Sequence, residues 1–273
     1  MSVINTNVKS IMAQNALTVN NRSLSKAMEQ LSTGKRINGA ADDAAGLAIS
    51  SRMQAQIRGL NQGVRNANDA ISMIQTAEGS TKEITNMLER MRELSVQAAN
   101  DTYGTDDRTA IQTEVDQLVE EIDRIATNTE WNGKKILGDA ATNYSYQVGS
   151  GSTTSSSVTV TFDQMNATSL GVNSLTLDSY ANATSAISSI DAAIQTVDTF
   201  RATLGAKINR MTSAADNLAN ISMNTAASRS RIEDADYASA TTELARTQII
   251  QQAATAMLAQ ANQQPQAVLS LLR

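Results

Sequence analysis

Residues 53–77 read MQAQIRGLNQGVRNANDAISMIQTA, and their spacing indicates the fold class. The apolar side chains are separated alternately by four and three residues, which is the spacing of one face of an α-helix. The pattern slips once near Gly79 and then resumes, so it predicts one long helix over residues 53–100. The positions that set the pattern are Met53, Ile57, Leu60, Val64, Ala67, Ile71, Ile74, Ala77, Ile84, Leu88 and Met91, flanked by Leu94 and Ala98.

Two further segments carry the same spacing. Residues 111–125 predict a shorter helix, preceded by Thr105, Asp106 and Asp107 as a cap and first-turn acids. Residues 187–218 predict a helix comparable to the first. The first helix would be roughly 70 Å long at 1.5 Å per residue, whereas a compact ball of this chain length would measure only about 50 Å. The sequence therefore predicts a mainly α fold, an elongated coiled-coil rod. The alternative is a set of separate helices in an ordinary globule.

The region between the second and third helices predicts the β structure. Asn132-Gly133 is a turn signal, and residues 143–161 alternate as strands do around a loop rich in Gly, Ser and Thr. This pattern predicts a β-hairpin in the middle of the chain. Residues 169–177 predict a second pair of short strands. Alternate positions that lie on one face of a strand are Tyr144, Tyr146 and Val148 in the first strand, and Val158, Val160 and Phe162 in the second.

The composition excludes several classes of function. With no Cys and no His in 273 residues, the chain cannot form a disulfide framework, the usual zinc sites or a Ser-His-Asp triad. A formal net charge of −5 argues against binding nucleic acid by counterion release. No stretch reaches the roughly 18 to 20 apolar residues that cross a bilayer. We therefore predict no enzymatic activity, no cofactor, no metal, no nucleic-acid partner and no membrane insertion.

The two ends of the chain are poor in charge. Residues 1–21 contain one charged side chain, Lys9, and residues 247–273 contain one, Arg273. Each end carries a helical apolar stripe among Gln, Asn, Ser, Thr and Ala, so water solvates its outer face poorly. Other copies of the same chain are a natural environment for such helices. We predict that both ends are disordered in the monomer and fold on assembly, because alone they bury too little apolar area.

Two long motifs lie at the ends of the chain. The N-terminal motif comprises INTN at 4–7, LSTGKRIN at 31–38 and DDAAGL at 42–47. The C-terminal motif comprises SRIEDADYA at 230–238, QANQ at 260–263 and LSLL at 269–272. Together they resemble the terminal signatures of bacterial flagellins, the subunits of the flagellar filament. The chain resembles a minimal two-domain flagellin, because only residues 167–181 lie where many flagellins insert large variable domains.

The resemblance implies an inner coiled coil of both termini that lines the filament channel, surrounded by an outer rod. It implies four segments: an inner helix and loop at 1–45, outer helices with the hairpin at 46–180, a returning outer helix at 181–235, and an inner helix at 236–273. The side chains expected to pack in the inner core are Ile11, Leu17, Leu24, Leu31, Ile250, Met257, Leu258, Leu269 and Leu272.

The loop that joins the inner and outer helices carries charges at Lys35, Arg36, Asp42 and Asp43. One interpretation is a simple connector. The other is that these charges pair with neighbouring subunits and fix the register between the inner and outer tubes.

Residues 89–100 place Arg90, Glu93, Leu94 and Gln97 on one helical stripe. Composition alone indicates a solvated helix face. By resemblance, this stripe with Glu114 of the next helix is the surface that animal Toll-like receptor 5 recognises on flagellin. In that case an exposed Leu94 would be an interface anchor.

The resemblance further implies a self-polymerising subunit of an extracellular flagellar filament for motility, exported by the type III pathway without a cleaved signal peptide. The partners it implies are further copies of the chain, a secretion chaperone on the C-terminal helix, the filament cap, hook-filament junction proteins and Toll-like receptor 5. One alternative is a hook-filament junction protein. Another, from a different class, is a cytosolic helical-bundle adaptor.

Overall fold

The fold is described from a computed structural model that covers the backbone of residues 6–138, 141–151, 153 and 156–271, and the side chains among them up to residue 263. The chain is mainly α-helical, as the sequence predicts, and it contains two small antiparallel strand pairs. In chain order the elements are α1 (Val8–Thr33), α2 (Ala44–Ala98), α3 (Thr105–Asn128), β1 (Glu130–Trp131), β2 (Lys134–Lys135), β3 (Thr142–Gln147), β4 (Ser157–Phe162), α4 (Ala167–Leu170), α5 (Tyr180–Glu233) and α6 (Tyr237–Leu271).

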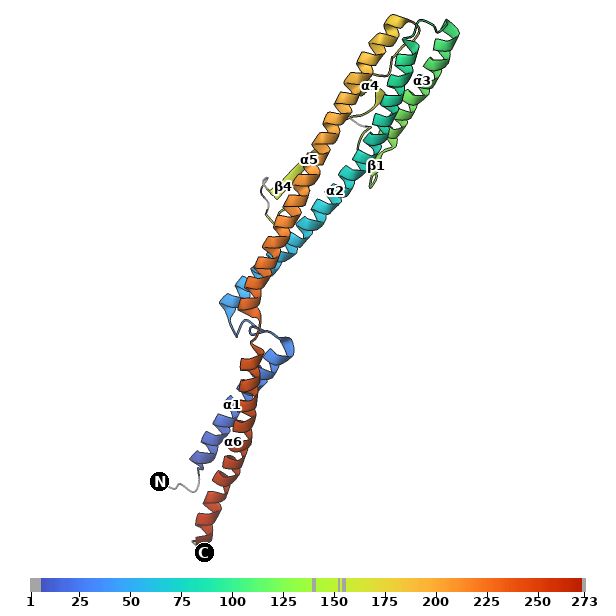
Figure 1. The fold of residues 1–273 in the computed structure, drawn as a ribbon. Coiled ribbons are helices and arrows are strands. Elements are labelled where there is room, and N and C mark those ends of the chain that lie inside the picture. The colour runs from blue at the N-terminus through green and yellow to red at the C-terminus, as the bar shows by residue number, and fades with distance from the viewer. Residues whose placement is uncertain (1–5, 139–140, 152, 154–155, 272–273) are drawn as a thin grey trace. The chain divides into compact units, whose positions relative to one another are not determined.

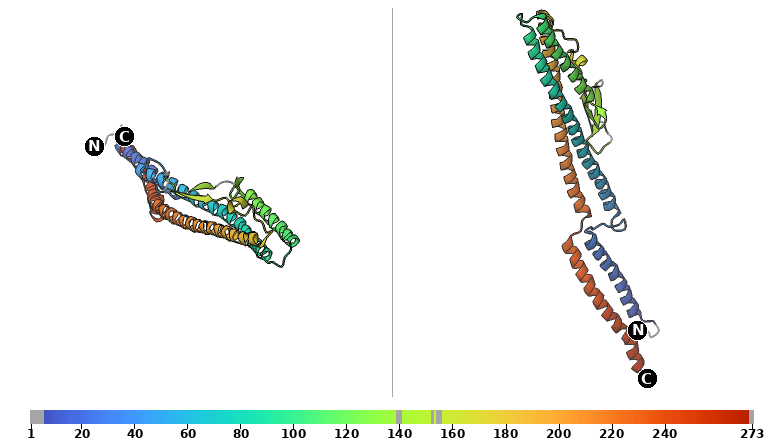
Figure 2. Two further views of the ribbon diagram at one scale, coloured as in Figure 1. Left: turned by 90° about the horizontal axis from the view of Figure 1, so that it is seen from above. Right: turned by 90° about the vertical axis from the view of Figure 1, so that its right-hand side faces the viewer.

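The chain divides into two compact units. The terminal unit contains residues 1–57 and 223–273, and the central unit contains residues 58–222. The terminal unit therefore holds α1, α6, the start of α2 and the end of α5. In this unit α1 lies beside α6, and in the central unit α2, α3 and α5 lie side by side (Figures 1 and 2).

All three predicted helices are present, and each is longer than its apolar pattern. α2 begins at Ala44 and continues through Gly79, and α5 begins at Tyr180 and ends at Glu233. In the central unit one hydrophobic core joins α2, α3 and α5, and fully burying an aliphatic side chain there stabilises the fold by about 1.5–3 kcal/mol. Its largest fully buried helical side chains include Ile74, Ile84, Leu88, Met91, Ile122, Ile190, Leu204 and Met211.

The predicted hairpin is β3 paired antiparallel with β4, in a register that sets Tyr144 opposite Val160. The hairpin approaches α2 closely, because the side-chain amide of Asn66 donates a 2.8 Å hydrogen bond to the carbonyl of Gln147. A Cβ on Gly63 would lie only 3.1 Å from the carbonyl oxygen of Val148. Gly63, which has no side chain, therefore makes room for the strand end.

The predicted Asn132-Gly133 turn joins the other strand pair, in which Glu130 faces Lys135. Asn132 has φ 49° and Gly133 has φ 73°. Two consecutive residues at positive φ are what a tight two-residue hairpin requires, and Asn-Gly adopts them at low cost.

The predicted strand pair at residues 169–177 is wrong. Its first residues belong to the short helix α4, which begins after the side-chain cap of Asn166 and ends at Leu170, with Gly171 as its C-cap. Two polar groups of the backbone that follows bond to one side chain of α3 instead of to a second strand. Gln112 accepts a 2.8 Å hydrogen bond from the N–H of Leu177 and donates one of 3.0 Å to the carbonyl of Leu175. A single glutamine thus satisfies two of the polar groups that the alternating pattern assigned to a strand ladder.

Candidate functional site

The N- and C-terminal helices pair through a seam that repeats every seven residues. Its positions on each helix are separated alternately by three and four residues, which is the period of a coiled coil. The seam is modest in apolar content, because small and polar residues alternate with leucines. Its buried or half-buried positions are Ser10, Ala13, Leu17, Asn20, Leu24, Ala27 and Leu31 on α1, and Ala240, Leu244, Thr247, Gln251, Ala254, Leu258 and Ala261 on α6.

Polar bonds cross this seam. The side-chain amide of Asn20 donates a 2.8 Å hydrogen bond to the backbone carbonyl of Thr247, where both residues are buried. Nearer the start of α1, Asn7 donates a 2.8 Å bond to the carbonyl of Ala261. Partner numbers fall along α6 as they rise along α1, so the helices are antiparallel. Each bond forms at only one alignment of the helices, so these side chains help to define the register.

The side chains predicted for the inner core divide into three groups. Leu17, Leu24, Leu31 and Leu258 are half-buried in the seam of their own chain. Ile11, Ile250 and Met257 instead point away from it and are 48%, 40% and 66% exposed. Leu269 and Leu272 lie outside the described side chains.

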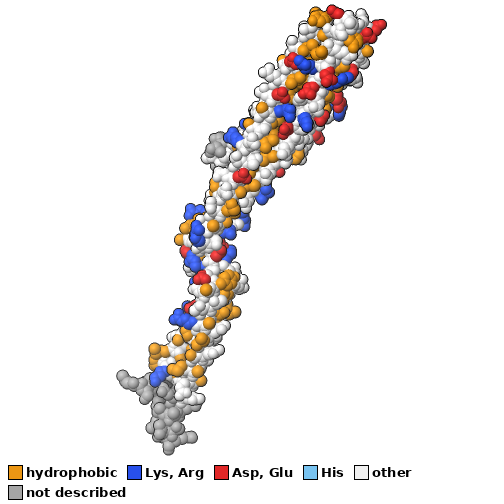
Figure 3. Space-filling model, in the orientation of Figure 1, with side chains coloured by type: hydrophobic (Ala, Val, Ile, Leu, Met, Phe, Trp, Pro, Cys, Tyr) orange, Lys and Arg blue, Asp and Glu red, His pale blue; other side chains and the backbone are white. Residues whose placement is uncertain are grey.

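Among the described residues, α1 and α6 expose eight large apolar side chains that are not aromatic. Figure 3 shows hydrophobic side chains at the surface of these helices. Exposed apolar side chains gathered on one element mark an interaction surface when they recur along its length. We call this set the outer apolar surface, and it consists of Val8, Ile11, Met12, Val19, Met28, Ile249, Ile250 and Met257.

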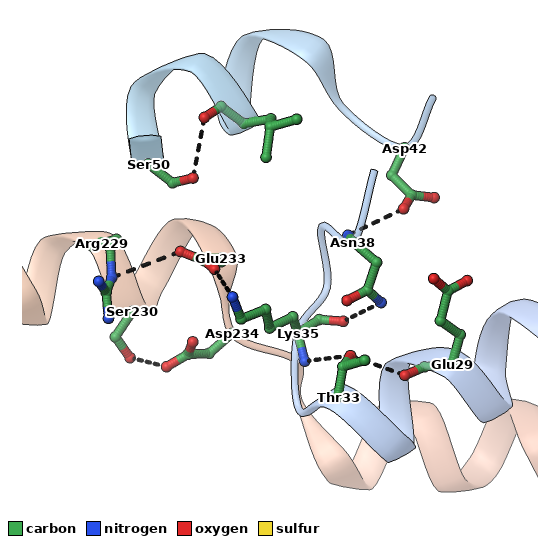
Figure 4. A network of polar contacts seen from close by, with 11 residues as sticks. Glu29, Thr33, Lys35, Asn38, Asp42, Ser50, Arg229, Ser230, Glu233 and Asp234 are labelled. Carbon is green, nitrogen blue, oxygen red and sulfur yellow. Dashed lines mark hydrogen bonds and ion pairs between the residues drawn. The ribbon is translucent and has the colours of Figure 1, made fainter. Parts of the chain in front are cut away.

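Ion pairs and hydrogen bonds join the loop after α1 to the end of α5. The ammonium group of Lys35 lies 2.5 Å from the carboxylate of Glu233, which Arg229 approaches at 3.6 Å (Figure 4). The guanidinium of Arg36 donates a 2.6 Å bond to the carbonyl of Ile232. The backbone pairs here as well, because the N–H of Arg36 donates to the carbonyl of Glu233 at 2.7 Å. These bonds hold two segments together that lie almost 200 positions apart in the sequence.

The two loop aspartates have partners within the chain. Asp42 lies 2.7 Å from the ammonium of Lys26, and this bond, followed by the N–H groups of Asn38 and Gly39, lowers its pKa. Asp43 accepts a 2.8 Å bond from the N–H of Gly46 and so caps the start of α2. All four predicted loop residues thus make contacts inside the terminal unit. Pairing with neighbouring subunits stays a prediction.

An exposed charge cluster lies where α2 faces α3. Arg90 donates bonds of 2.9 Å from Nε and 2.8 Å from Nη2 to one carboxylate oxygen of Glu114, and a 3.2 Å bond to Glu93. Glu114 first, and then Glu93, raises the pKa of Arg90. The predicted Arg90, Glu93 and Glu114 are therefore adjacent in space although they come from two helices. Gln97 is exposed nearby on α2 and donates to the hydroxyl of Tyr103 at 3.3 Å.

The expectation that Leu94 is exposed is wrong. Leu94 is only 2% exposed and belongs to the core of the central unit. It lies three residues after Met91 and four before Ala98, both fully buried, so it shares their helix face. The exposed apolar residue of this turn is Val96, at 50%.

A metal-ligand cluster and a membrane-spanning helix are both absent from the described residues. Within them, no three acidic side chains converge as they would around a metal ion. In the same part of the chain no helix is long and apolar enough to cross a membrane.

The comparisons with known proteins cover almost the whole chain. Residues 4–142 match the bacterial flagellin N-terminal helical region, and residues 187–272 match the bacterial flagellin C-terminal helical region. The chain belongs to the bacterial flagellin family. Flagellin of Halalkalibacterium halodurans is 46% identical over 99% of this chain and 100% of its own length. Flagellin of Bacillus subtilis is 42% identical over 99% of both chains.

The fold is also similar to that of a solved structure with low sequence identity. A Vibrio parahaemolyticus structure, provisionally named a flagellar hook-associated protein, has a TM-score of 0.59 at 13% identity and covers 71% of this chain and 100% of its own. Such a likeness shows the fold alone. Sequence identity to flagellins is what assigns this chain as a structural subunit of the flagellar filament.

Sequence reasoning missed two roles in this flagellin. Asn20 and Thr247 occupy seam positions, and the signal was the seven-residue spacing that they share with the leucines of α1 and α6. Asp43 caps α2, and its signal was an aspartate immediately before a helical segment.

Proposed function

We propose that this filament subunit polymerises through its outer apolar surface into a helical tube that serves bacterial motility. The observation that carries the proposal is the exposure of Ile11, Ile250 and Met257 on helices with almost no charge at their ends. Burial of apolar surface stabilises an assembly by about 25 cal/mol for each Å². Covering this surface with other copies of the chain is therefore favourable. Identical contacts that do not close into a ring extend into a filament.

Microscopy of the purified chain tests this assembly. Under precipitating salt the wild-type chain should form long tubes, and Ile11→Glu with Ile250→Glu should abolish them, because a buried unpaired carboxylate is strongly unfavourable. Tyr180→Glu is the matched control, since it places the same charge at a 55% exposed apolar position of the central unit. Long tubes from the double variant would refute the proposed surface. Short rings from the wild type would favour the hook-filament junction role, and a dispersed monomer would favour an adaptor.

We also propose that Arg90, Glu93, Gln97 and Glu114 form a surface recognised by Toll-like receptor 5. Support comes from their exposure and from the Arg90–Glu114 bonds, which present a guanidinium and carboxylates on one face. Leu94 remains in this proposal only as the buried support beneath them, because it cannot reach a partner without disrupting the core.

A reporter-cell assay tests receptor recognition. Arg90→Ala should reduce the response strongly, while Arg92→Ala should leave it unchanged. Arg92 is a matched control because it is exposed to nearly the same extent, 47% against 49%, and pairs with Asp191 on α5 rather than with α3. An undiminished response to Arg90→Ala would reject the surface.

The remaining partners follow from the same helices. We propose that the chain leaves the cell through the flagellar type III pathway without a cleaved signal peptide, with a secretion chaperone covering α6, a cap that folds it at the filament tip, and junction proteins at the filament base. The exposure of apolar residues such as Ile249 and Met257 supports the binding of a chaperone to α6 before export. Amide exchange on the chain isolated from host cytoplasm should show α6 protected relative to the free chain, and unchanged exchange would reject the chaperone.

A further inference from the structure

The methionines of this flagellin differ in exposure between the two units. The strongly exposed ones, at 67%, 56%, 62% and 66%, all belong to the terminal unit and are Met12, Met28, Met223 and Met257. The buried ones, at 3% or less, all belong to the central unit and are Met73, Met91, Met165 and Met211. Met53 and Met87 are half-buried, and Met1 lies outside the described residues.

We propose that Met12, Met28 and Met257 are sites of sulfoxide formation by hydrogen peroxide, and that this modification blocks assembly. All three belong to the outer apolar surface, so the inference rests on the proposed polymerisation through that surface. Exposure of the sulfur controls the reaction, because the oxidant has to touch it.

The reaction needs no group beyond the thioether and the peroxide. A sulfur lone pair attacks one peroxide oxygen, so an S–O bond forms while the O–O bond breaks. The second oxygen leaves as water after the proton of the first oxygen transfers to it. Sulfur loses two electrons and the peroxide gains two, and methionine sulfoxide results.

Methionine sulfoxide on the outer apolar surface should disfavour assembly. A sulfoxide oxygen is a strong hydrogen-bond acceptor, and assembly would bury it among apolar side chains. Charged donors are scarce around Met12 and Met257, since residues 1–21 and 247–273 hold one cationic side chain each, Lys9 and Arg273. Met28 is two residues from Lys26, whose ammonium group lies 2.7 Å from Asp42. A buried acceptor without a donor disfavours the assembled state.

The buried methionines of the central unit should resist oxidation by hydrogen peroxide. Met91 and Met211 are fully buried, and Met73 is 3% exposed. The sulfur of Met73 also accepts a 2.6 Å hydrogen bond from the hydroxyl of Tyr146. These sulfurs react only after local opening of the core, so oxidation leaves this fold intact.

The experiment compares the full wild-type chain with the variant Met12→Leu, Met28→Leu, Met257→Leu, each with and without dilute hydrogen peroxide. Leucine conserves the volume and apolar character of methionine. Peptide mass spectrometry locates the oxygen atoms, sedimentation gives the critical concentration for polymerisation, and methionine sulfoxide reductases supply the reversal.

We expect peroxide to raise the critical concentration of the wild type by at least about tenfold, with reversal by the reductases. The triple variant, which retains Met223, should polymerise equally with and without peroxide. Wild type that polymerises unchanged with three sulfoxides would overturn this inference alone, and so would a triple variant that peroxide inactivates. Untreated wild type that forms no polymer would overturn the proposed function as well.

Discussion

The side-chain amide of Asn20 on α1 donates a 2.8 Å hydrogen bond to the backbone carbonyl of Thr247 on α6. Asn20 is 7% exposed and Thr247 is 1% exposed, so the bond lies at the buried centre of the helix pair. A slip of the pair by one heptad would leave the asparagine opposite a different turn of α6. A single buried polar residue in a coiled-coil seam can define register in this way.

Replacing Asn20 with Ala should loosen the helix pair. The loss of one buried hydrogen bond lowers stability by about 1 kcal/mol, which corresponds to roughly a fivefold fall in amide-exchange protection of α1 and α6. The adjacent Asn21→Ala is the control, because Asn21 is exposed and accepts only a 3.2 Å bond from Gln251. Equal effects of the two substitutions would contradict a role for the buried bond.

Replacing Leu94 with Ala should destabilise the central unit. Truncating a fully buried leucine costs about 2–5 kcal/mol through lost burial and the cavity left behind. Urea unfolding followed by circular dichroism measures this loss. Val96→Ala on the same helix should change stability little, since Val96 is 50% exposed. If Leu94→Ala unfolds like the wild type, Leu94 is not a core residue.

Replacing Gly46 with Ala should disturb the start of α2. A Cβ at this position would lie 2.6 Å from Cδ1 of Ile37 and would also collide with the capping carboxylate of Asp43. Overpacking of this kind costs about 1–3 kcal/mol, measurable as a lower midpoint of thermal unfolding. Gly39→Ala, in the loop just before α2, is the matched control, because no described heavy atom lies within 4 Å of its added Cβ. A normal midpoint for Gly46→Ala would rule out the close packing.

The hydroxyl of Tyr146 should titrate later than an ordinary tyrosine. Burial first, and then the charges of Tyr144 and Asp69, raises its pKa from 10.0 to about 12. Because the folded-state pKa lies above the unfolded value, this contribution to stability is complete below pH 10.0 and is lost as the pH rises toward about 12. Tyrosinate absorbance should show one late-titrating group, and Tyr146→Phe should remove that step. Persistence of the late step in Tyr146→Phe would assign it to another tyrosine.

The helical part of the fold was accessible from the sequence because burial has to follow the 3.6-residue period. The stripe through Ile74, Leu88 and Met91 is buried as its spacing predicts. The hairpin was accessible for a similar reason, since its alternation matches the two faces of a strand. Residues 169–177 were misread because their backbone partner is the side chain of Gln112, and a local pattern carries no information about a distant glutamine.

The candidate site was predicted less completely. Arg90, Glu93 and Glu114 were placed together correctly, but Leu94 was assigned to the surface when it belongs to the core. Its position in the repeat allowed both assignments, and only the location of α3 and α5 distinguishes them. For the terminal helices, the sequence indicated the seam leucines and the charge-poor ends but not Asn20 and Thr247. Ile11 and Ile250 could be assigned to the outer surface only once α1 and α6 were paired.

The sequence alone determined the helical class, the hairpin and the family, because each depends on local spacing or on long motifs that survive without coordinates. The tertiary structure decided which charges meet, as in Lys35 with Glu233, and which apolar side chains stay exposed, as in Met257. The physical reason is that ion pairs and burial depend on distances between segments separated by almost 200 residues or more. A local repeat fixes the face on which a side chain lies, but the surrounding helices determine what that face contacts.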